Sequence, residues 1–387
     1  MRTAAIVALL AAGIMAGAQL GKIAPLVPWY RSEAGFSLVS IGWLTALIAV
    51  FVAIAALPAG WAIQRFGTRQ ASILSFILLA AGGVALAFAN TPAAVLLARL
   101  LEGIGYLALV IAVPALLSDM SPAGWRASVM AVWGGFVPIG FAVANYLAAA
   151  VIPAAGERGF LLIATLAFAV FAVPAIPLVL RTRDANGSHS AQSNGAYLKQ
   201  SLGLPIVLLS LAFGAYVISS IGFFTFMPAF VQETGDRFVV SAGFIALMVP
   251  VGNLIAGVLL HGRDARAAAM LAGLGFVISV LFSVPAFASV NTAVATAAAI
   301  AIAIAGGIIA SALFAAIPVF VPRGGSVSMA IGLVAQAGGI GTLLGPPLAG
   351  AIIERYSWWG LGAFLSVAAL AGLVCVAPLV TERTQRA

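Results

Sequence analysis

The chain has 387 residues, of which 63% are hydrophobic and only 7% are charged, with 18 basic and 10 acidic side chains and a formal net charge of +8. About a quarter of the residues in a soluble domain are charged, so this composition excludes a soluble fold and indicates that lipid is the solvent. The basic residues stand singly or in pairs between apolar runs, without the clustered stripe that nucleic-acid binding needs. Cys375, His189 and His261 are too few and too scattered for a disulfide or a metal centre, and we expect no cofactor.

The first segment imitates a secretory signal, because Arg2 precedes an apolar stretch that reaches small residues at positions 16–18. Apolar character continues past Lys22 to Trp29, which is too long for a signal core. We therefore expect a retained first transmembrane helix.

Apolar runs between polar or Pro/Gly breaks predict twelve transmembrane helices. The first six are expected near residues 5–29, 38–63, 70–89, 92–117, 127–152 and 159–180, and the second six near residues 202–231, 238–261, 266–288, 291–321, 326–353 and 357–380. Residues 181–200 are rich in Ser, Asn and Gly and are typical of a flexible linker. The predicted fold is an all-α membrane protein with two six-helix bundles, residues 1–180 and 201–387, joined by the linker 181–200.

Basic residues fall mostly on one side when the predicted spans are threaded through a bilayer. That side holds Arg2, Arg65, Arg69, Arg126, Arg181, Arg183, Lys199, Arg263, Arg266, Arg323, Arg383 and Arg386, whereas the other side holds Arg31, Arg158, Arg237 and Arg355, each near an acidic residue. The positive-inside rule then places both termini and the linker in the cytoplasm, with the chain in the inner membrane.

The two predicted bundles also share sequence features. Met130 and Ala131 follow a turn with Pro122 and Gly124, and Met329 and Ala330 follow one with Pro322 and Gly324. Such a correspondence indicates parallel duplication of a six-helix unit.

The turn after the second predicted span reads GWAIQRFGTRQ, residues 60–70. It resembles the loop signature of the major facilitator superfamily, whose glycines and basic residues are matched by Gly60, Arg65, Gly67 and Arg69. Gln64 replaces the family's acidic residue, so this position lacks the carboxylate whose gating contact the resemblance implies.

Three other segments carry the resemblance. RLLEGIG, residues 99–105, is similar to the superfamily's fourth-helix motif. GTLLGPP, residues 341–347, is similar to a motif that many exporters carry on the fifth helix, but here it lies in the eleventh span. The segment 21–47 most resembles the cyanate and nitroimidazole permease branch. The resemblance implies a carrier that moves a small solute between two halves.

Three ionisable residues stand out inside predicted spans: Lys22, Arg99 and Glu102. Inserting each of them into a bilayer costs about 2.5–3.5 kcal/mol. Arg99, Glu102 and Tyr106 share one face of the fourth helix, and Gln19 and Lys22 share one face of the first. We predict that Lys22 and Arg99 bind an anionic solute with help from Gln19 and Tyr106, and that Glu102 carries a coupling proton. The alternative is an Arg99–Glu102 ion pair of purely structural role, with Lys22 reaching toward the interface.

Four neutral polar residues near the middle of other spans are further candidates for solute binding: Asn145, Tyr216, Asn253 and Gln336. Gly13, Gly17 and Gly21 repeat every fourth residue, so a neighbouring backbone can approach the first helix closely, either to slide or to pack statically.

We predict a monomeric secondary transporter for a small, anionic solute, coupled to protons, and no enzyme. A drug or metabolite exporter of the same superfamily is the alternative. A membrane-embedded enzyme or a channel is more remote, because Glu102 is the only carboxylate expected in a span and no repeated filter-like loop is present.

Overall fold

The computed structural model describes residues 2–181, 203–235, 239–261, 263, 265–321 and 327–381. These residues form helices joined by short turns, and no strand occurs among them. Ten of the described helices are long and apolar enough to cross a membrane. The chain is therefore a multi-pass membrane protein, which confirms the predicted helical class.

The helices follow one another closely in the sequence. Residues up to 181 form α1 (Arg2–Gly21), a 3-10 turn (Ala24–Leu26), α2 (Val27–Ser32), α3 (Leu38–Ala46), a 3-10 turn (Leu47–Ala49), α4 (Val50–Phe66), α5 (Thr68–Phe88), α6 (Pro92–Met120), α7 (Ala123–Gly134) and α8 (Phe136–Leu180). Residues from 203 form α10 (Leu204–Thr234), α11 (Ala242–Leu259), α12 (Ala265–Ala288), α13 (Thr292–Phe320) and α14 (Val327–Thr381). We call these two parts the first and second halves.

Two helices are too long for one crossing. At about 1.5 Å per residue, the 45 residues of α8 and the 55 of α14 each exceed twice the roughly 30 Å hydrocarbon core. Each contains one residue with positive φ, Gly156 at 67° and Ser357 at 60°. Gly156 falls inside the break expected between residues 152 and 159, and Ser357 is the residue at which the last helix was expected to begin.

The first predicted helix, residues 5–29, is wrong as a single helix. α1 ends at Gly21, and a 3-10 turn that starts at Ala24 leads into α2. Pro25 and Pro28 lie in these first turns and have no N–H to donate to a preceding carbonyl, so they break the helical ladder. Lys22 therefore lies in a turn between helical segments.

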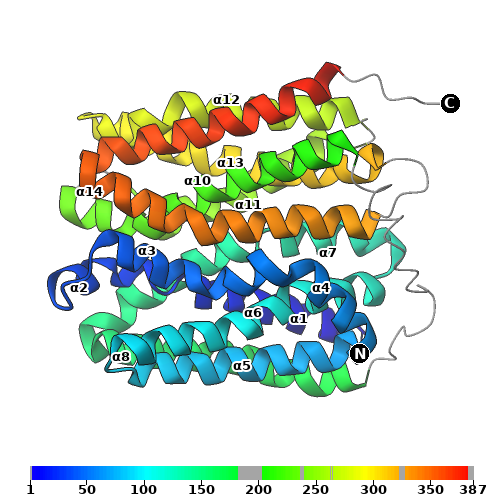
Figure 1. Cartoon of the computed structure of the whole chain (residues 1–387), viewed down its shortest axis with the longest axis horizontal. Coiled ribbons are helices and arrows are strands. Elements are labelled where there is room, and N and C mark those ends of the chain that lie inside the picture. The colour runs from blue at the N-terminus through cyan, green and yellow to red at the C-terminus, as the bar shows by residue number, and fades with distance from the viewer. Residues whose placement is uncertain are drawn as a thin grey trace.

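The helices run side by side, with α5 and α8 at one edge and α12 at the opposite edge (Figure 1). Between these edges α14 packs against α3 and α4. The close approach depends on small residues, because a Cβ atom at Gly42 of α3 would lie 2.5 Å from the Pro346 carbonyl oxygen of α14. The two halves thus meet along α3, α4 and α14.

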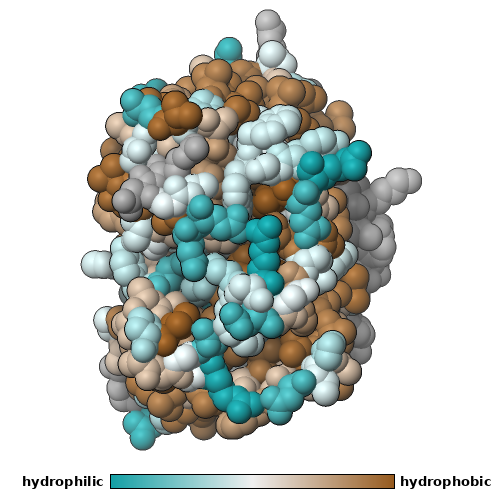
Figure 2. Space-filling view, turned by 90° about the vertical axis from the view of Figure 1, so that its left-hand side faces the viewer, coloured by the Kyte–Doolittle hydropathy of each residue, from teal (hydrophilic) through white to brown (hydrophobic). Residues whose placement is uncertain are grey.

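The two ends of the molecule differ. The start of α1 and the end of α14 lie at one end, the terminal end, and α2 lies at the other, the α2 end (Figure 1). Figure 2 looks onto the α2 end, where hydrophilic residues gather toward the middle and hydrophobic residues lie around them. A hollow of about 740 Å³ opens among α2, α8 and α10, lined in part by Trp29, Asn145 and Gln232.

Candidate functional site

Lys22, Glu102, Arg99 and Gln19 form one cluster inside the first half, and none of their side chains is exposed. Lys22 Nζ lies 2.5 Å from Glu102 Oε1 and 2.7 Å from Gln19 Oε1. Arg99 Nη1 lies 2.6 Å from Glu102 Oε2. Both carboxylate oxygens of Glu102 thus accept from a cation, and the cluster carries a net charge of +1 when all three groups are ionised.

Arg99 is held mostly by backbone carbonyls. Its Nε donates to Leu44 O at 2.8 Å, its Nη2 to Thr45 O at 3.0 Å, and its Nη1 also reaches Gln19 O at 3.2 Å. Leu44 and Thr45 lie in the last turn of α3, where helix carbonyls lack intrahelical partners and the dipole favours a cation. Sequence patterns did not indicate these partners, since a carbonyl has no side-chain signature.

Gln19 completes the network by donating from Nε2 to Ala164 O of α8 at 3.0 Å. The cluster therefore joins α1, α3, α6 and α8. Close packing surrounds it, because a Cβ atom at Gly82 of α5 would lie 2.6 Å from Glu102 Cγ. We call these four residues the ion cluster.

The ion cluster brings together four of the residues that the sequence singled out. The Arg99–Glu102 pair expected under the structural alternative is present at i, i+3. Lys22 does not reach toward an interface, since it is fully buried and points at Glu102. Tyr106, one turn beyond Glu102 on α6, is buried beside the Phe136 ring with centroids 6.4 Å apart. Neither Tyr106 nor any residue of the ion cluster lines the hollow at the α2 end or the small pocket in the second half.

The neutral candidates are dispersed rather than gathered. Asn145 lines the hollow at the α2 end, and its amide donates to Phe141 O at 2.8 Å. Asn253 Oδ1 accepts from Ser311 Oγ at 3.1 Å inside the second half.

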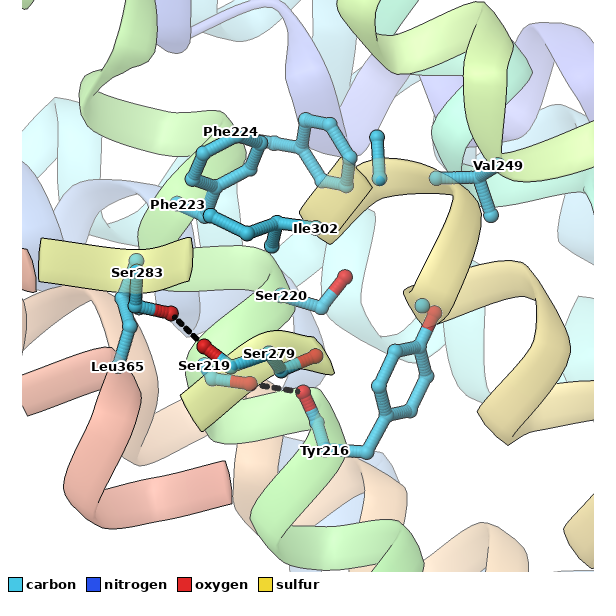
Figure 3. A pocket seen from close by; sticks show the side chains of 12 residues that line it. Tyr216, Ser219, Ser220, Phe223, Phe224, Val249, Ser279, Ser283, Ile302 and Leu365 are labelled. Atoms are coloured by element: carbon cyan, nitrogen blue, oxygen red, sulfur yellow. Dashed lines mark hydrogen bonds between the residues drawn. The ribbon is translucent and has the colours of Figure 1, made fainter. Parts of the chain in front are cut away.

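Of the other two neutral candidates, Gln336 joins the halves and Tyr216 lies within the second half. Gln336 Nε2 donates to Ala53 O at 3.2 Å, which joins α14 to α4. Tyr216 lines a small pocket of about 20 Å³ inside the second half (Figure 3).

The predicted gating loop lies at the junction of α4 and α5. Gly67 has φ of +98°, a conformation that glycine adopts without strain, and it ends α4. Gly60 and Arg65 belong to α4 and Arg69 to the first turn of α5. The Arg65 side chain and that of Gln64 lie outside the described residues.

A second group of polar contacts joins the halves at the α2 end, and no pattern in the sequence predicted it. Glu233 at the end of α10 accepts from the Arg31 guanidinium of α2 and from Trp358 Nε1 at 3.2 Å. Glu354 of α14 accepts from the backbone N–H of Leu38, at the start of α3, at 2.5 Å. The acidic partner of Arg31 is 202 residues away in the sequence. We call these contacts the latch.

A helical membrane protein with a charged cluster buried among its helices and a polar contact between its halves has the features of a transporter. The Major Facilitator Superfamily model matches residues 7–340. The chain belongs to this family, as the motifs indicated, and it is a transporter rather than an enzyme.

Curated relatives and solved structures agree with this family. The chain is 24% identical over 367 residues to the nitrite extrusion protein of Bacillus subtilis, covering 92% of this chain and 88% of that one. It is 22% identical over 242 residues to multidrug resistance protein 1 of Bacillus subtilis, spanning 62% of this chain and 60% of that relative. A match to the Escherichia coli galactose-proton symporter, 25% identical, covers 33% of this chain and 28% of the symporter.

Among solved structures, a bacterial homolog to the human lysosomal transporter Spinster has a TM-score of 0.77 at 18% identity, covering 100% of this chain and 99% of that one. At this identity the likeness shows the fold alone.

Proposed function

We propose that the chain is a secondary active transporter that moves a small anion between its halves by alternating access. Counting α8 and α14 as two crossings each, divided at Gly156 and Ser357, turns ten candidate spans into twelve. The first six crossings then belong to the first bundle, residues 1–180, and the last six to the second bundle, residues 201–387. Rocking of such halves about a central site is how duplicated carriers work.

The net positive charge of the ion cluster is the observation that supports an anionic solute. A buried charge is costly in a membrane and is rarely kept without a task. The described residues of the second half bury no lysine, arginine, aspartate or glutamate, so the positive field comes from the first half. The nitrite extrusion protein, the relative aligned over most of both chains, is named for an anion.

Proton coupling is assigned to Glu102 because it holds both cations of the cluster. Protonating this carboxylate removes one negative charge, which raises the net charge from +1 to +2 and frees Lys22 and Arg99 for another anion. A bound anion and a bound proton then favour each other, and the coupling is reciprocal.

Uptake into proteoliposomes tests this function with nitrite and benzoate as probe anions and an imposed pH gradient. We expect Lys22→Gln, which leaves a cluster without net charge, to weaken anion uptake at least tenfold. Uptake by Glu102→Gln should be the same with and without the imposed pH gradient. The double variant Lys22→Gln/Glu102→Gln is the matched control, since it keeps the net charge of +1 while losing the titrating group.

Two results would contradict the assignment. Uptake of both anions by the natural chain that ignores the pH gradient would exclude proton coupling. Normal gradient-driven uptake by Glu102→Gln would exclude this residue as the proton carrier.

The orientation that we propose places the terminal end, with both termini and the linker, in the cytoplasm of the inner membrane. An impermeant maleimide added to intact cells should then label Asn90→Cys, between α5 and α6, and spare Trp125→Cys at the start of α7. The reverse labelling would invert the topology. The protein is proposed to act as a monomer, which light scattering in detergent tests.

Export of a drug or metabolite is the second candidate function. The similarity to multidrug resistance protein 1 favours it, whereas the position of the GTLLGPP segment in α14, rather than in the fifth span, weakens it. Hydrophobic amines that raise the melting temperature when anions do not, and that do so equally in Lys22→Gln, would support this candidate over the anion carrier. The cyanate and nitroimidazole branch stays a prediction.

A further inference from the structure

The small pocket in the second half is lined by hydroxyl groups on one side and by aromatic rings on the other. Tyr216, Ser219 and Ser220 of α10 and Ser279 and Ser283 of α12 supply the hydroxyls (Figure 3). Phe223 and Phe224 pack edge to face with ring centroids 5.0 Å apart. The volume of about 20 Å³ suits one water molecule or one hydroxyl group.

Most hydroxyl protons in this pocket are already donated to the backbone. Ser219 donates to Tyr216 O at 2.9 Å, Ser279 to Gly275 O at 3.0 Å and Ser283 to Ser279 O at 2.6 Å. Each serine oxygen keeps lone pairs that can accept. Tyr216 and Ser220 each add a hydroxyl group to the lining, and a hydroxyl can donate one proton as well as accept. The pocket therefore suits a group that both donates and accepts, as a hydroxyl does.

The pocket and the ion cluster lie on opposite sides of one pair of rings. Phe224 of the second half packs against Phe141 of α8, with centroids 5.9 Å apart. Phe141 in turn packs on α1 next to the cluster, since a Cβ atom at Gly21 would lie 2.9 Å from Phe141 Cγ, and Lys22 is the next residue. These contacts therefore run from the pocket through Phe224 and Phe141 to the residue next to Lys22.

The sequence numbering relates the two sites as well. α6 and α13 both have 29 residues and begin 200 positions apart, at Pro92 and Thr292. At that spacing Glu102 corresponds to Ile302, which lines the pocket. The second half thus has an uncharged pocket where the first half has its carboxylate.

We propose that the pocket receives a hydroxyl group of the transported solute, and that the solute is a small organic anion whose carboxylate faces the ion cluster once Phe141 and Phe224 separate. The inference rests on the proposed anion transport and adds the chemical class of the solute. Tyr216 and Ser220 would select for the hydroxyl, and the aromatic rings would cover the apolar body between the two polar groups.

Thermal-shift titrations of the full chain in detergent test the proposal with 3- and 4-hydroxybenzoate, benzoate and benzyl alcohol. At least one hydroxybenzoate should bind about tenfold more tightly than benzoate, the effect of one well-placed hydrogen bond. Tyr216→Phe and Ser220→Ala should each remove that advantage and leave benzoate affinity unchanged. Ser210→Ala is the matched control, because this buried serine of α10 bonds to Ile206 O and does not line the pocket.

The outcomes separate this proposal from the proposed function. Equal affinity for benzoate and both hydroxybenzoates, unchanged in Tyr216→Phe, overturns the hydroxyl site and leaves anion binding intact. Stabilisation by benzyl alcohol that Ser220→Ala abolishes, without any by the three carboxylates, supports the hydroxyl site and overturns the anion. No stabilisation by any of the four probes overturns both.

Discussion

Arg99 shows how one residue can hold a charged cluster inside a membrane protein. Its guanidinium makes four hydrogen bonds in a fixed fork, three of them to the backbone of α1 and α3. A lysine at this position would keep the charge but would supply a single donor group on a flexible stem. The geometry of the fork, rather than the charge alone, links the helices.

We therefore expect Arg99→Lys to destabilise the protein although it preserves the net charge. Leu44 O and Thr45 O would each lose a partner in a buried place, at about 1–3 kcal/mol for each carbonyl left unsatisfied. Thermal unfolding in detergent, followed by tryptophan fluorescence, measures the loss.

Arg158→Lys provides the comparison for that measurement. Arg158 also donates to a carbonyl, Ala87 O at 2.9 Å, and to Asn90 at 3.0 Å, but this second bond is exposed and water can replace it. The melting temperature should fall much less than in Arg99→Lys. Equal falls in melting temperature in the two variants would mean that the buried hydrogen bonds of Arg99 stabilise the protein no more than those of Arg158.

At the scale of the helix, α1 and α8 are pressed together by the glycines that the sequence singled out. Gly17 faces Phe136 and Gly140, and Gly21 faces Phe141. The prediction of close backbone approach is confirmed at Gly17 and Gly21, whereas Gly13 faces the ring of Trp133 in α7. The choice between sliding and static packing stays open. This contact also places Gln19 and Lys22 beside α6.

Gly17→Ala should weaken this contact. The added methyl group would collide with the Phe136 carbonyl oxygen and lie 3.0 Å from its carbon, and overpacking of this kind costs about 1–3 kcal/mol. The melting temperature should fall.

Gly257→Ala in α11 tests whether a glycine-to-alanine change by itself lowers the melting temperature. A Cβ atom at Gly257 meets nothing within 4 Å, and alanine favours a helix by up to about 1 kcal/mol. This variant should be as stable as the natural chain or more so. A Gly17→Ala protein that melts no lower than Gly257→Ala would show that α1 and α8 can move apart freely.

At the scale of the whole molecule, the latch joins the two halves at the α2 end. Arg31 and Glu233 are 49% and 37% exposed, so their ion pair contributes little to stability. The carboxylate of Glu354 at the start of α3 adds a favourable interaction with the helix dipole. A weak contact that breaks in each cycle suits alternating access better than a strong one.

Fixing the latch should stop transport. Cysteines at Arg31 and Glu233, in a Cys375→Ser background, can be joined by a bis-maleimide, and uptake into proteoliposomes should then fall to background. The same reagent on Asn90→Cys/Arg158→Cys joins the α5–α6 turn to α8 within the first half and should leave uptake unchanged. Continued transport by the cross-linked Arg31–Glu233 pair would show that the α2 end need not open.

The sequence by itself determined the solvent, the helical class, the family and the ionisable residues of the core. These properties are local, because each apolar run, proline break or motif is read within a few dozen residues. The expected breaks near Gly156 and Ser357 follow from the same local reading. The interrupted first helix was missed because Pro25 and Pro28 lie in an otherwise apolar run.

Only the tertiary structure decided which groups meet. Lys22 and Glu102 are 80 residues apart, and Arg31 and Glu233 are 202 apart, so no spacing in the sequence pairs them. The packing of the glycine faces sets how the helices lie against one another, and this brings the Leu44 and Thr45 carbonyls to Arg99. Contacts between helices depend on the shapes of both partners at once, whereas composition and periodicity describe one segment at a time.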